Sequence, residues 1–96
     1  MAVRILIKRR IPKDFDVSLF NKLVRQLRAL AAAQSGYISG ETLRRVDQPH
    51  EVLVISTWKD MSAWNAWQAS RERAEIQAQV DALLGTQTEF EAYEYT

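Results

Sequence analysis

The most informative segment of the chain is Ile55-Ser56-Thr57-Trp58-Lys59-Asp60-Met61-Ser62-Ala63-Trp64-Asn65-Ala66-Trp67. It joins the end of an apolar strand directly to a helix, because Asp60 is a good helix N-cap. All three tryptophans of the chain lie within this segment. Trp64 and Trp67 are three residues apart, so on a helix they share one face. We expect this face to belong to the core and to form one wall of an apolar pocket.

The composition is that of one globular domain, which we expect to span residues 1–96. Hydrophobic residues make up 47% and charged residues 26%, both ordinary proportions. No apolar run is long enough to cross a membrane and no signal-peptide pattern is present, so we expect a cytoplasmic protein without a membrane partner. The chain has no cysteine, which excludes disulfides, thiolate metal ligands and a cysteine nucleophile.

The net charge is only +1, so the field of the whole molecule is weak. A basic cluster nevertheless occupies residues 8–10, and the C-terminal segment is acidic. A basic cluster can mark a nucleic-acid surface. The alternative is cross-strand pairing, in which Lys8 and Arg10 face Glu89 and Glu91. The near-zero net charge favours pairing, and we expect no nucleic-acid partner.

The first half of the chain predicts a strand, a helix and a second strand. Residues 2–10 alternate, with Val3, Ile5 and Ile7 on one face and Arg4, Leu6 and Lys8 on the other. Asp16 is a suitable N-cap for a helix whose apolar residues recur at helical spacing. Gly36 marks its expected end, since glycine accepts the left-handed conformation. Residues 37–46 then read as a polar strand near a sheet edge.

The second half predicts a strand, a broken helical unit and a last strand. Residues 47–50 are turn formers, and residues 51–58 form a strand that is apolar throughout its centre, as expected when both faces are covered. The helical unit begins after Asp60, has a second cap at Ser70 and ends at Gly85. Residues 86–95 form the last strand.

The order β-α-β-β-α-β predicts an α+β domain of the ferredoxin-like class. Such a domain has a four-stranded antiparallel sheet with both helical units on one face. Nothing remains in the chain to cover the other face, yet Leu6 and the apolar third strand indicate that this face is not simply wet. A second copy of the sheet is the simplest cover. We therefore expect a homodimer in which two sheets form a dimeric α/β barrel.

The chain resembles the antibiotic biosynthesis monooxygenase (ABM) domain family of the dimeric α/β barrel superfamily. The segments that carry the resemblance are Ala2-Val3-Arg4-Ile5-Leu6-Ile7, Ser35-Gly36-Tyr37, Ser56-Thr57-Trp58-Lys59-Asp60 and Trp64-Asn65-Ala66-Trp67. The resemblance implies either a cofactor-independent oxygenase of polycyclic aromatic substrates or a haem-degrading oxygenase. In both, the substrate lies in an apolar cavity between the helices and the sheet of each subunit.

The haem-degrading branch of that family uses an asparagine on the first strand, a tryptophan and an iron-ligating histidine. Trp67 matches the tryptophan, but the histidine position falls on Gln77 and the asparagine position falls near Ile7 or Lys8. Glutamine is a poor iron ligand compared with imidazole, which disfavours haem breakdown. We expect no cofactor and no metal site. The only histidine, His50, lies in a predicted turn without neighbouring ligands, where an exposed, idle side chain is the simpler interpretation.

The catalytic residues are not assignable from the sequence, but a pocket is. Its predicted wall consists of Trp67, Trp64, Gln77, Ile7, Phe20, Leu23 and Ile55. The candidates for a polar lining that stabilises a developing anion are Lys8, Asn21 and Tyr37, together with Gln77. For each, an ordinary core or surface role is the competing interpretation.

Three functions follow from these residues and the resemblance. The first is a cofactor-independent monooxygenase that acts on a small apolar or aromatic metabolite. The second is a non-catalytic, ligand-binding or regulatory dimer that uses the same cavity, which the absence of a clear acid or base keeps open. The third is haem binding or degradation, which the unmatched histidine and asparagine disfavour.

Overall fold

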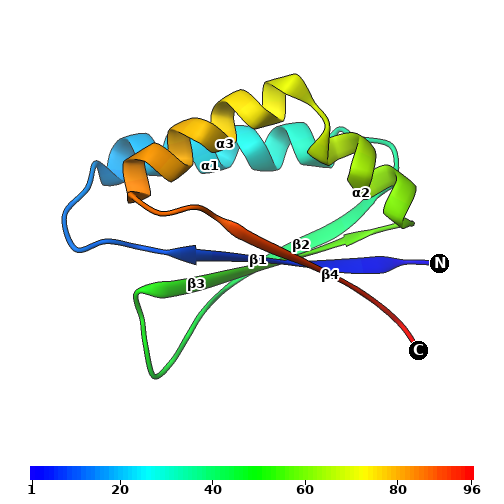
Figure 1. The fold of residues 1–96 in the computed structure, drawn as a ribbon, viewed down its shortest axis with the longest axis horizontal. Coiled ribbons are helices and arrows are strands. Elements are labelled where there is room, and N and C mark those ends of the chain that lie inside the picture. The colour runs from blue at the N-terminus through cyan, green and yellow to red at the C-terminus, as the bar shows by residue number, and fades with distance from the viewer.

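The computed structural model describes all 96 residues and contains four strands and three helices (Figure 1). In chain order the elements are β1 (Val3–Arg10), α1 (Val17–Ala32), β2 (Tyr37–Arg44), β3 (Glu51–Trp58), α2 (Met61–Gln68), α3 (Arg71–Leu84) and β4 (Glu89–Glu94). This order confirms the predicted ferredoxin-like arrangement. The second helical unit is divided into α2 and α3 near Ser70, as the second cap predicted.

The four strands form one antiparallel sheet in the order β2-β3-β1-β4, and all three helices lie on one side of it (Figure 1). The first strand therefore lies in the interior of the sheet, between β3 and β4. Val3 is opposite Trp58 on one side and Glu94 on the other. Because side chains alternate along a strand, this register fixes which residues face the helices.

The helix ends follow local capping chemistry. The Asp60 carboxylate accepts a hydrogen bond from the backbone N–H of Ala63 at 2.8 Å, and Asp16 and Ser70 cap α1 and α3 in the same way. Gly85 ends α3 in the left-handed conformation, as predicted. The end of α1 was predicted too late. The helix stops at Ala32, and Gly36, with φ 103°, lies in the turn that leads into β2.

The core lies between the helices and the sheet and is centred on Trp58, which is fully buried. Its indole N–H donates to the Ser56 hydroxyl at 3.2 Å. The rings of Tyr37 and Trp64 meet it edge-on, with centroids at 5.4 and 5.8 Å, and Trp67 stacks at 6.3 Å. Such aromatic pairs add stability beyond the burial of their area. The remaining buried apolar residues are Val3, Ile5, Leu23, Leu27, Val80 and Leu84.

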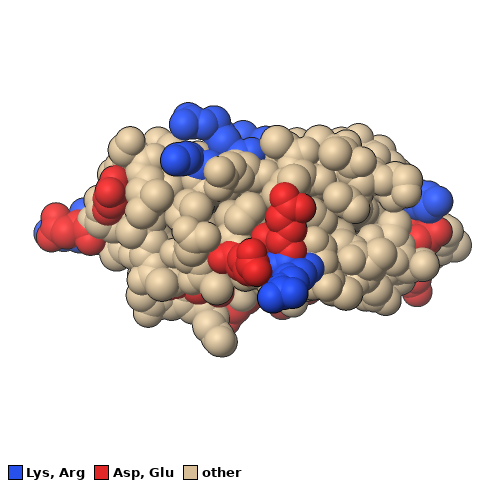
Figure 2. All heavy atoms as spheres, turned by 90° about the horizontal axis from the view of Figure 1, so that it is seen from above, with Lys and Arg blue, Asp and Glu red and all other residues tan.

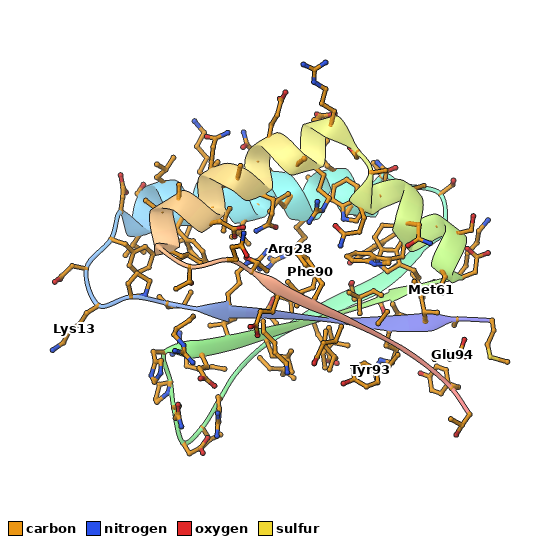
Figure 3. The ribbon with its side chains drawn as sticks, in the orientation of Figure 1. Lys13, Arg28, Met61, Phe90, Tyr93 and Glu94 are labelled. Carbon is orange, nitrogen blue, oxygen red and sulfur yellow. The ribbon has the colours of Figure 1, made fainter.

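The other face of the sheet carries no helix (Figure 1). Its strands present apolar residues along the middle of the face, and the register of the sheet assigns to it Leu6, Leu43, Leu53, Ile55 and Tyr93. Leu43 and Tyr93 are 46% and 53% exposed. In Figure 3, Tyr93 lies on the side of the sheet away from the helices. This open face is therefore less polar than the usual solvent-exposed face of an antiparallel sheet.

Charged pairs flank the apolar residues of the open face. The pairs are Arg4–Glu41 at 3.3 Å, Lys8–Glu91 at 2.9 Å and Arg10–Glu51 at 3.3 Å. The predicted pairing of Lys8 with the acidic C-terminal strand is confirmed, and Glu91 raises the pKa of the Lys8 ammonium group by hydrogen bonding and charge. Arg10 was predicted to face Glu89 or Glu91, but it binds Glu51 of β3 instead, since β4 begins only opposite Lys8.

The charges on the helix side are also dispersed. Figure 2, which looks onto the molecule from above the helices, shows small separate groups of both signs on a largely uncharged surface. No helix of the chain is both long enough and apolar enough to cross a bilayer.

Candidate functional site

A cavity of about 90 Å³ lies between the helices and the sheet. All seven helices and strands contribute to its walls. The lining residues are Ile7, Arg9, Val24, Leu27, Arg28, Ala31, Tyr37, Gly40, Glu41, Thr42, Val54, Ser56, Trp58, Trp64, Trp67, Arg73, Gln77 and Phe90. At about 30 Å³ per molecule, this space equals roughly three waters. It is smaller than the roughly 300–1,000 Å³ of a usual ligand pocket.

One wall of the cavity is aromatic. Trp64 and Trp67 reach it from α2, and Phe90 reaches it from β4. The Trp64 and Phe90 ring centroids are 5.9 Å apart, so the rings from α2 and β4 contact each other. In Figure 3, Phe90 points from the sheet toward the helices. These rings supply a flat, apolar surface of the kind on which an aromatic ligand packs.

Three arginines also line the cavity, namely Arg9, Arg28 and Arg73. Arg9 and Arg73 are buried, with exposed fractions of 8% and 7%. In Figure 3, Arg28 lies on the helix side of the sheet. The Arg73 guanidinium lies 5.1 Å above the Phe90 ring centroid, a cation–π contact. The Nε atom of Arg9 is buried without any hydrogen-bond partner.

Burial lowers the pKa of the Arg9 guanidinium. The charge of Asp81 opposes that effect, and the positive charges of Arg28 and Arg73 add to it. Burial likewise lowers the pKa of Arg73, again opposed by Asp81. An arginine stays protonated in proteins, so these shifts mean that burial makes the charge of each guanidinium unfavourable.

A hydrogen-bond network at the end of α3 holds Gln77 in place. Its amide nitrogen donates to Asp81 Oδ1 and to the Thr88 hydroxyl, both at 2.8 Å. Asp81 Oδ1 also accepts from the Thr88 hydroxyl at 2.7 Å and from the Thr88 backbone N–H at 3.2 Å. Both N–H groups of the Gln77 amide are therefore used, which leaves its oxygen as the polar atom it can offer to a ligand.

Half of the residues predicted for the pocket line this cavity. They are Trp67, Trp64, Gln77, Ile7 and Tyr37. Lys8 and Ile55 lie on the open face of the sheet, because they alternate with Ile7 and Val54 along their strands. Leu23 packs in the core and Phe20 against Phe15, and Asn21 is exposed to solvent. On α1 the cavity wall is formed instead by Val24, Leu27, Arg28 and Ala31.

The sequence analysis missed the arginines. A signal for Arg9 was present, since it continues the alternation of Val3, Ile5 and Ile7 on the helix-facing side of β1. Arg73 likewise lies four residues before Gln77 and so shares its helix face. Neither arginine was predicted to line the pocket, because a charged residue is usually exposed to solvent.

A second hollow, of about 990 Å³, lies at the end of the sheet where β1, β2 and β3 meet the segment before β4. Its lining is mostly charged and polar. Arg45 and Glu51 in this hollow are joined by an ion pair at 2.8 Å. The smaller cavity is the better candidate site, because it lies between the helices and the sheet and combines apolar side chains with convergent polar groups.

The only histidine, His50, is exposed in the turn before β3, where its carbonyl oxygen accepts from the Ile11 backbone N–H. It does not line the cavity. No group of three or more histidine, cysteine, aspartate or glutamate side chains is arranged to hold a metal ion.

The fold and the cavity define a ferredoxin-like α+β domain with a buried site lined by aromatic and cationic side chains. The family model for antibiotic biosynthesis monooxygenase matches residues 2–79, and the chain belongs to this family. A search of curated proteins found no match.

Solved structures share the fold at low sequence identity. A conserved protein from Methanosarcina mazei Go1 aligns with a TM-score of 0.87 at 21% identity, over 100% of this chain and 94% of its own. SnoaB from Streptomyces nogalater, described as a cofactor-independent oxygenase, gives 0.82 at 18% identity, over 99% and 93%. Rv0793 from Mycobacterium tuberculosis gives 0.83 at 17% identity, over 100% and 96%.

Proposed function

We propose that this protein is a cofactor-independent monooxygenase that oxidises a small aromatic molecule in the cavity between the helices and the sheet. Membership of the antibiotic biosynthesis monooxygenase family supports this proposal, as does the likeness in fold to a cofactor-independent oxygenase. The observation that carries it is the cavity itself, whose lining combines aromatic side chains with buried arginines.

The proposed reaction uses a phenol-type substrate and molecular oxygen alone. The deprotonated substrate gives one electron to oxygen, and the resulting superoxide and substrate radical combine at a ring carbon to form a hydroperoxide. Loss of water from the hydroperoxide leaves a carbonyl at that carbon. The substrate supplies all four electrons, one oxygen atom enters the product and the other leaves as water. The cavity supports this reaction by excluding water and by stabilising the substrate anion electrostatically.

Haem chemistry fits the site poorly. The residue at the position of the family's iron-ligating histidine is Gln77, and both N–H groups of its amide are bound to Asp81 and Thr88. No histidine lines the cavity. Imidazole and thiolate are the usual protein ligands of haem iron, and neither is offered here. We therefore derive no step through haem.

Oxygen uptake with a panel of phenols and hydroquinones tests the proposed function. We expect consumption without an added cofactor, and one ¹⁸O atom in the product when the reaction runs under ¹⁸O₂. Trp67→Phe should lower kcat/KM by about two- to tenfold, since an aromatic contact contributes about 0.5–1.5 kcal/mol. Asn65→Ala is the matched control, because Asn65 is exposed on the same helix. Absence of uptake with every member of the panel would contradict the proposal.

The second candidate is a ligand-binding module without catalytic activity. It is favoured by the absence of a clear general base: the one carboxylate residue of the lining, Glu41, is paired with Arg4. Quenching of tryptophan fluorescence separates the two candidates, since Trp64 and Trp67 line the cavity. A ligand that quenches the fluorescence but consumes no oxygen would favour the binding module.

We also propose that two copies associate through their open faces. The apolar residues along the middle of that face give the reason, because a contiguous exposed apolar surface usually marks an interaction site. A second copy of the chain offers a self-complementary cover. Light scattering at micromolar concentration should report a dimer, and Leu53→Glu should yield monomers. A monomeric protein under these conditions would overturn this part of the proposal.

A further inference from the structure

The buried arginines of the cavity lack counterions. The ion pairs of the molecule use Arg4, Lys8, Arg10, Arg45 and Arg71, all at the surface. None uses an arginine of the cavity. Arg9 is more than nine-tenths buried as a residue, and its Nε atom has no partner. Arg73 is also more than nine-tenths buried as a residue, and its guanidinium forms one hydrogen bond, to the Gln68 carbonyl at 3.4 Å.

The nearby carboxylates do not neutralise these two cations. Asp81 Oδ1 is occupied by hydrogen bonds from Gln77 and Thr88 and forms no ion pair with either arginine. Glu41 is bound to Arg4. Arg28, which is exposed and donates to the Thr42 hydroxyl at 3.3 Å, adds a third positive charge to the lining. The lining therefore carries more positive than negative charge, and two of its three cations belong to buried residues.

A buried charge without a partner is unfavourable, and an anionic ligand removes that cost when it binds. A guanidinium is planar and offers parallel N–H donors, an arrangement that matches the two oxygens of a carboxylate. The rings of Trp64, Trp67 and Phe90 line the same cavity, and the Arg73 guanidinium lies over the Phe90 ring. The lining thus offers both kinds of group that an aromatic acid needs, cations for its carboxylate and aromatic side chains for its ring.

We propose that the cavity binds an aromatic carboxylate, whose carboxylate group lies between Arg9 and Arg73 and whose ring lies against the aromatic wall. The inference rests on the proposed function, because it names the substrate class of the same site. The small volume favours a single ring over a polycyclic system. The nearby Asp81 carboxylate disfavours a ligand with a second negative charge. Arg9 and Arg73 are then the residues that determine specificity.

Matched pairs of ligands test this inference. Benzoate, 4-hydroxybenzoate and 1-naphthoate each have a neutral amide of nearly the same shape. Binding is measured without oxygen by tryptophan fluorescence, so the result does not depend on turnover. We expect each carboxylate to bind about tenfold or more tightly than its amide, as for hydrogen bonds to charged groups. Among the carboxylates, 1-naphthoate should bind most weakly, because its two rings are the largest for a cavity of about 90 Å³.

Variants assign the preference to the two residues. Arg9→Gln and Arg73→Gln should each remove the preference for carboxylate over amide. Arg9→Lys and Arg73→Lys keep the charge without the planar fork, so an intermediate preference is expected and folding is preserved. Arg25→Gln is the matched control, because Arg25 is exposed on α1 and forms no ion pair. The preference of Arg25→Gln for carboxylate over amide should equal that of the wild type.

Three results would overturn the inference. They are equal affinity for carboxylates and amides, absence of binding by both, and a preference that persists in both glutamine variants. Displacement of benzoate by equimolar inorganic phosphate would also overturn it, since the site would then be a general anion site. The test is separable from that of the proposed function. If carboxylates bind but no compound causes oxygen uptake, the oxygenase proposal is wrong and the inference stands. If oxygen is consumed with neutral phenols but carboxylates do not bind, the inference is wrong and the oxygenase proposal stands.

Discussion

Replacing Arg9 by methionine should make the protein more stable. The Arg9 guanidinium is buried and its Nε atom is unpaired, so it loses hydration on folding without a full set of partners. Leaving one buried donor unsatisfied costs about 1–3 kcal/mol. Methionine keeps most of the apolar length of the side chain and removes the charge. Replacing buried charges by apolar residues of similar volume is neutral or stabilising by about 1–4 kcal/mol.

We therefore expect Arg9→Met to raise the free energy of unfolding by about 1–3 kcal/mol. For a domain of this size, each 1 kcal/mol corresponds to an increase in Tm of about 4–8 °C. Urea unfolding at a fixed protein concentration measures the change, with an unchanged m-value as the check on two-state behaviour. Arg10→Met is the matched control. Arg10 is the next residue in β1 but lies on the open face with an exposed side chain, so its replacement should have little effect.

The expected gain in stability has a functional cost. If Arg9 is retained to hold an anion, Arg9→Met should lose the stabilisation that benzoate gives the wild type. A decrease in the free energy of unfolding by more than about 1 kcal/mol would refute the reasoning, because it would mean that the Arg9 charge is compensated within the fold. The same measurement on Arg10→Met shows whether such a decrease is specific to the buried position.

Two further predictions concern backbone strain and surface charge. Gly36→Ala should destabilise the protein more than Gly85→Ala, since both have positive φ but only the Cβ built at Gly36 lies within 2.6 Å of the Ala63 Cβ. For Gly85→Ala we expect a loss of about 1–2 kcal/mol in thermal or urea unfolding, and equal losses at the two sites would contradict the packing argument. Arg45 lowers the pKa of the Asp47 carboxyl by hydrogen bonding, so the stabilising pairing is present above about pH 3.9 and is lost as the pH falls through the lower pKa of the folded state. An NMR titration should show that Arg45→Gln raises the pKa of Asp47, and an unchanged value would rule out the ion pair in solution.

The fold was predictable because several local signals agreed. Asp60 caps α2 where the apolar strand ends, and the tryptophans that follow it enter the core. The alternation along β1 predicted a strand, and the apolar centre of β3 predicted a strand with both faces covered, which lies in the interior of the sheet. Each of these signals depends on residues that are close in sequence, so one amino-acid sequence is enough to predict these elements.

The site was less predictable, because it depends on fine differences in orientation. Lys8 and Arg9 are adjacent, yet a strand sends one to solvent and the other into the cavity. On α1, Leu23 packs in the core, whereas Val24 lines the cavity. A sequence pattern identifies an apolar face but does not say which part of it borders a void. The compensation of a buried charge depends on residues distant in sequence, and Asp81 is far along the chain from Arg9.

The place of β1 between β3 and β4 also bears on how the chain acquires its structure. Val3 pairs with Glu94, nearly the full length of the chain away, and pairings between such distant segments form slowly. Until β4 has been synthesised, one edge of β1 has no partner and Phe90 is not there to close the cavity. An unpaired edge next to Ile5 and Ile7 is open to pairing with other chains. The last strand thus completes the binding site and removes an aggregation-prone edge in the same folding event.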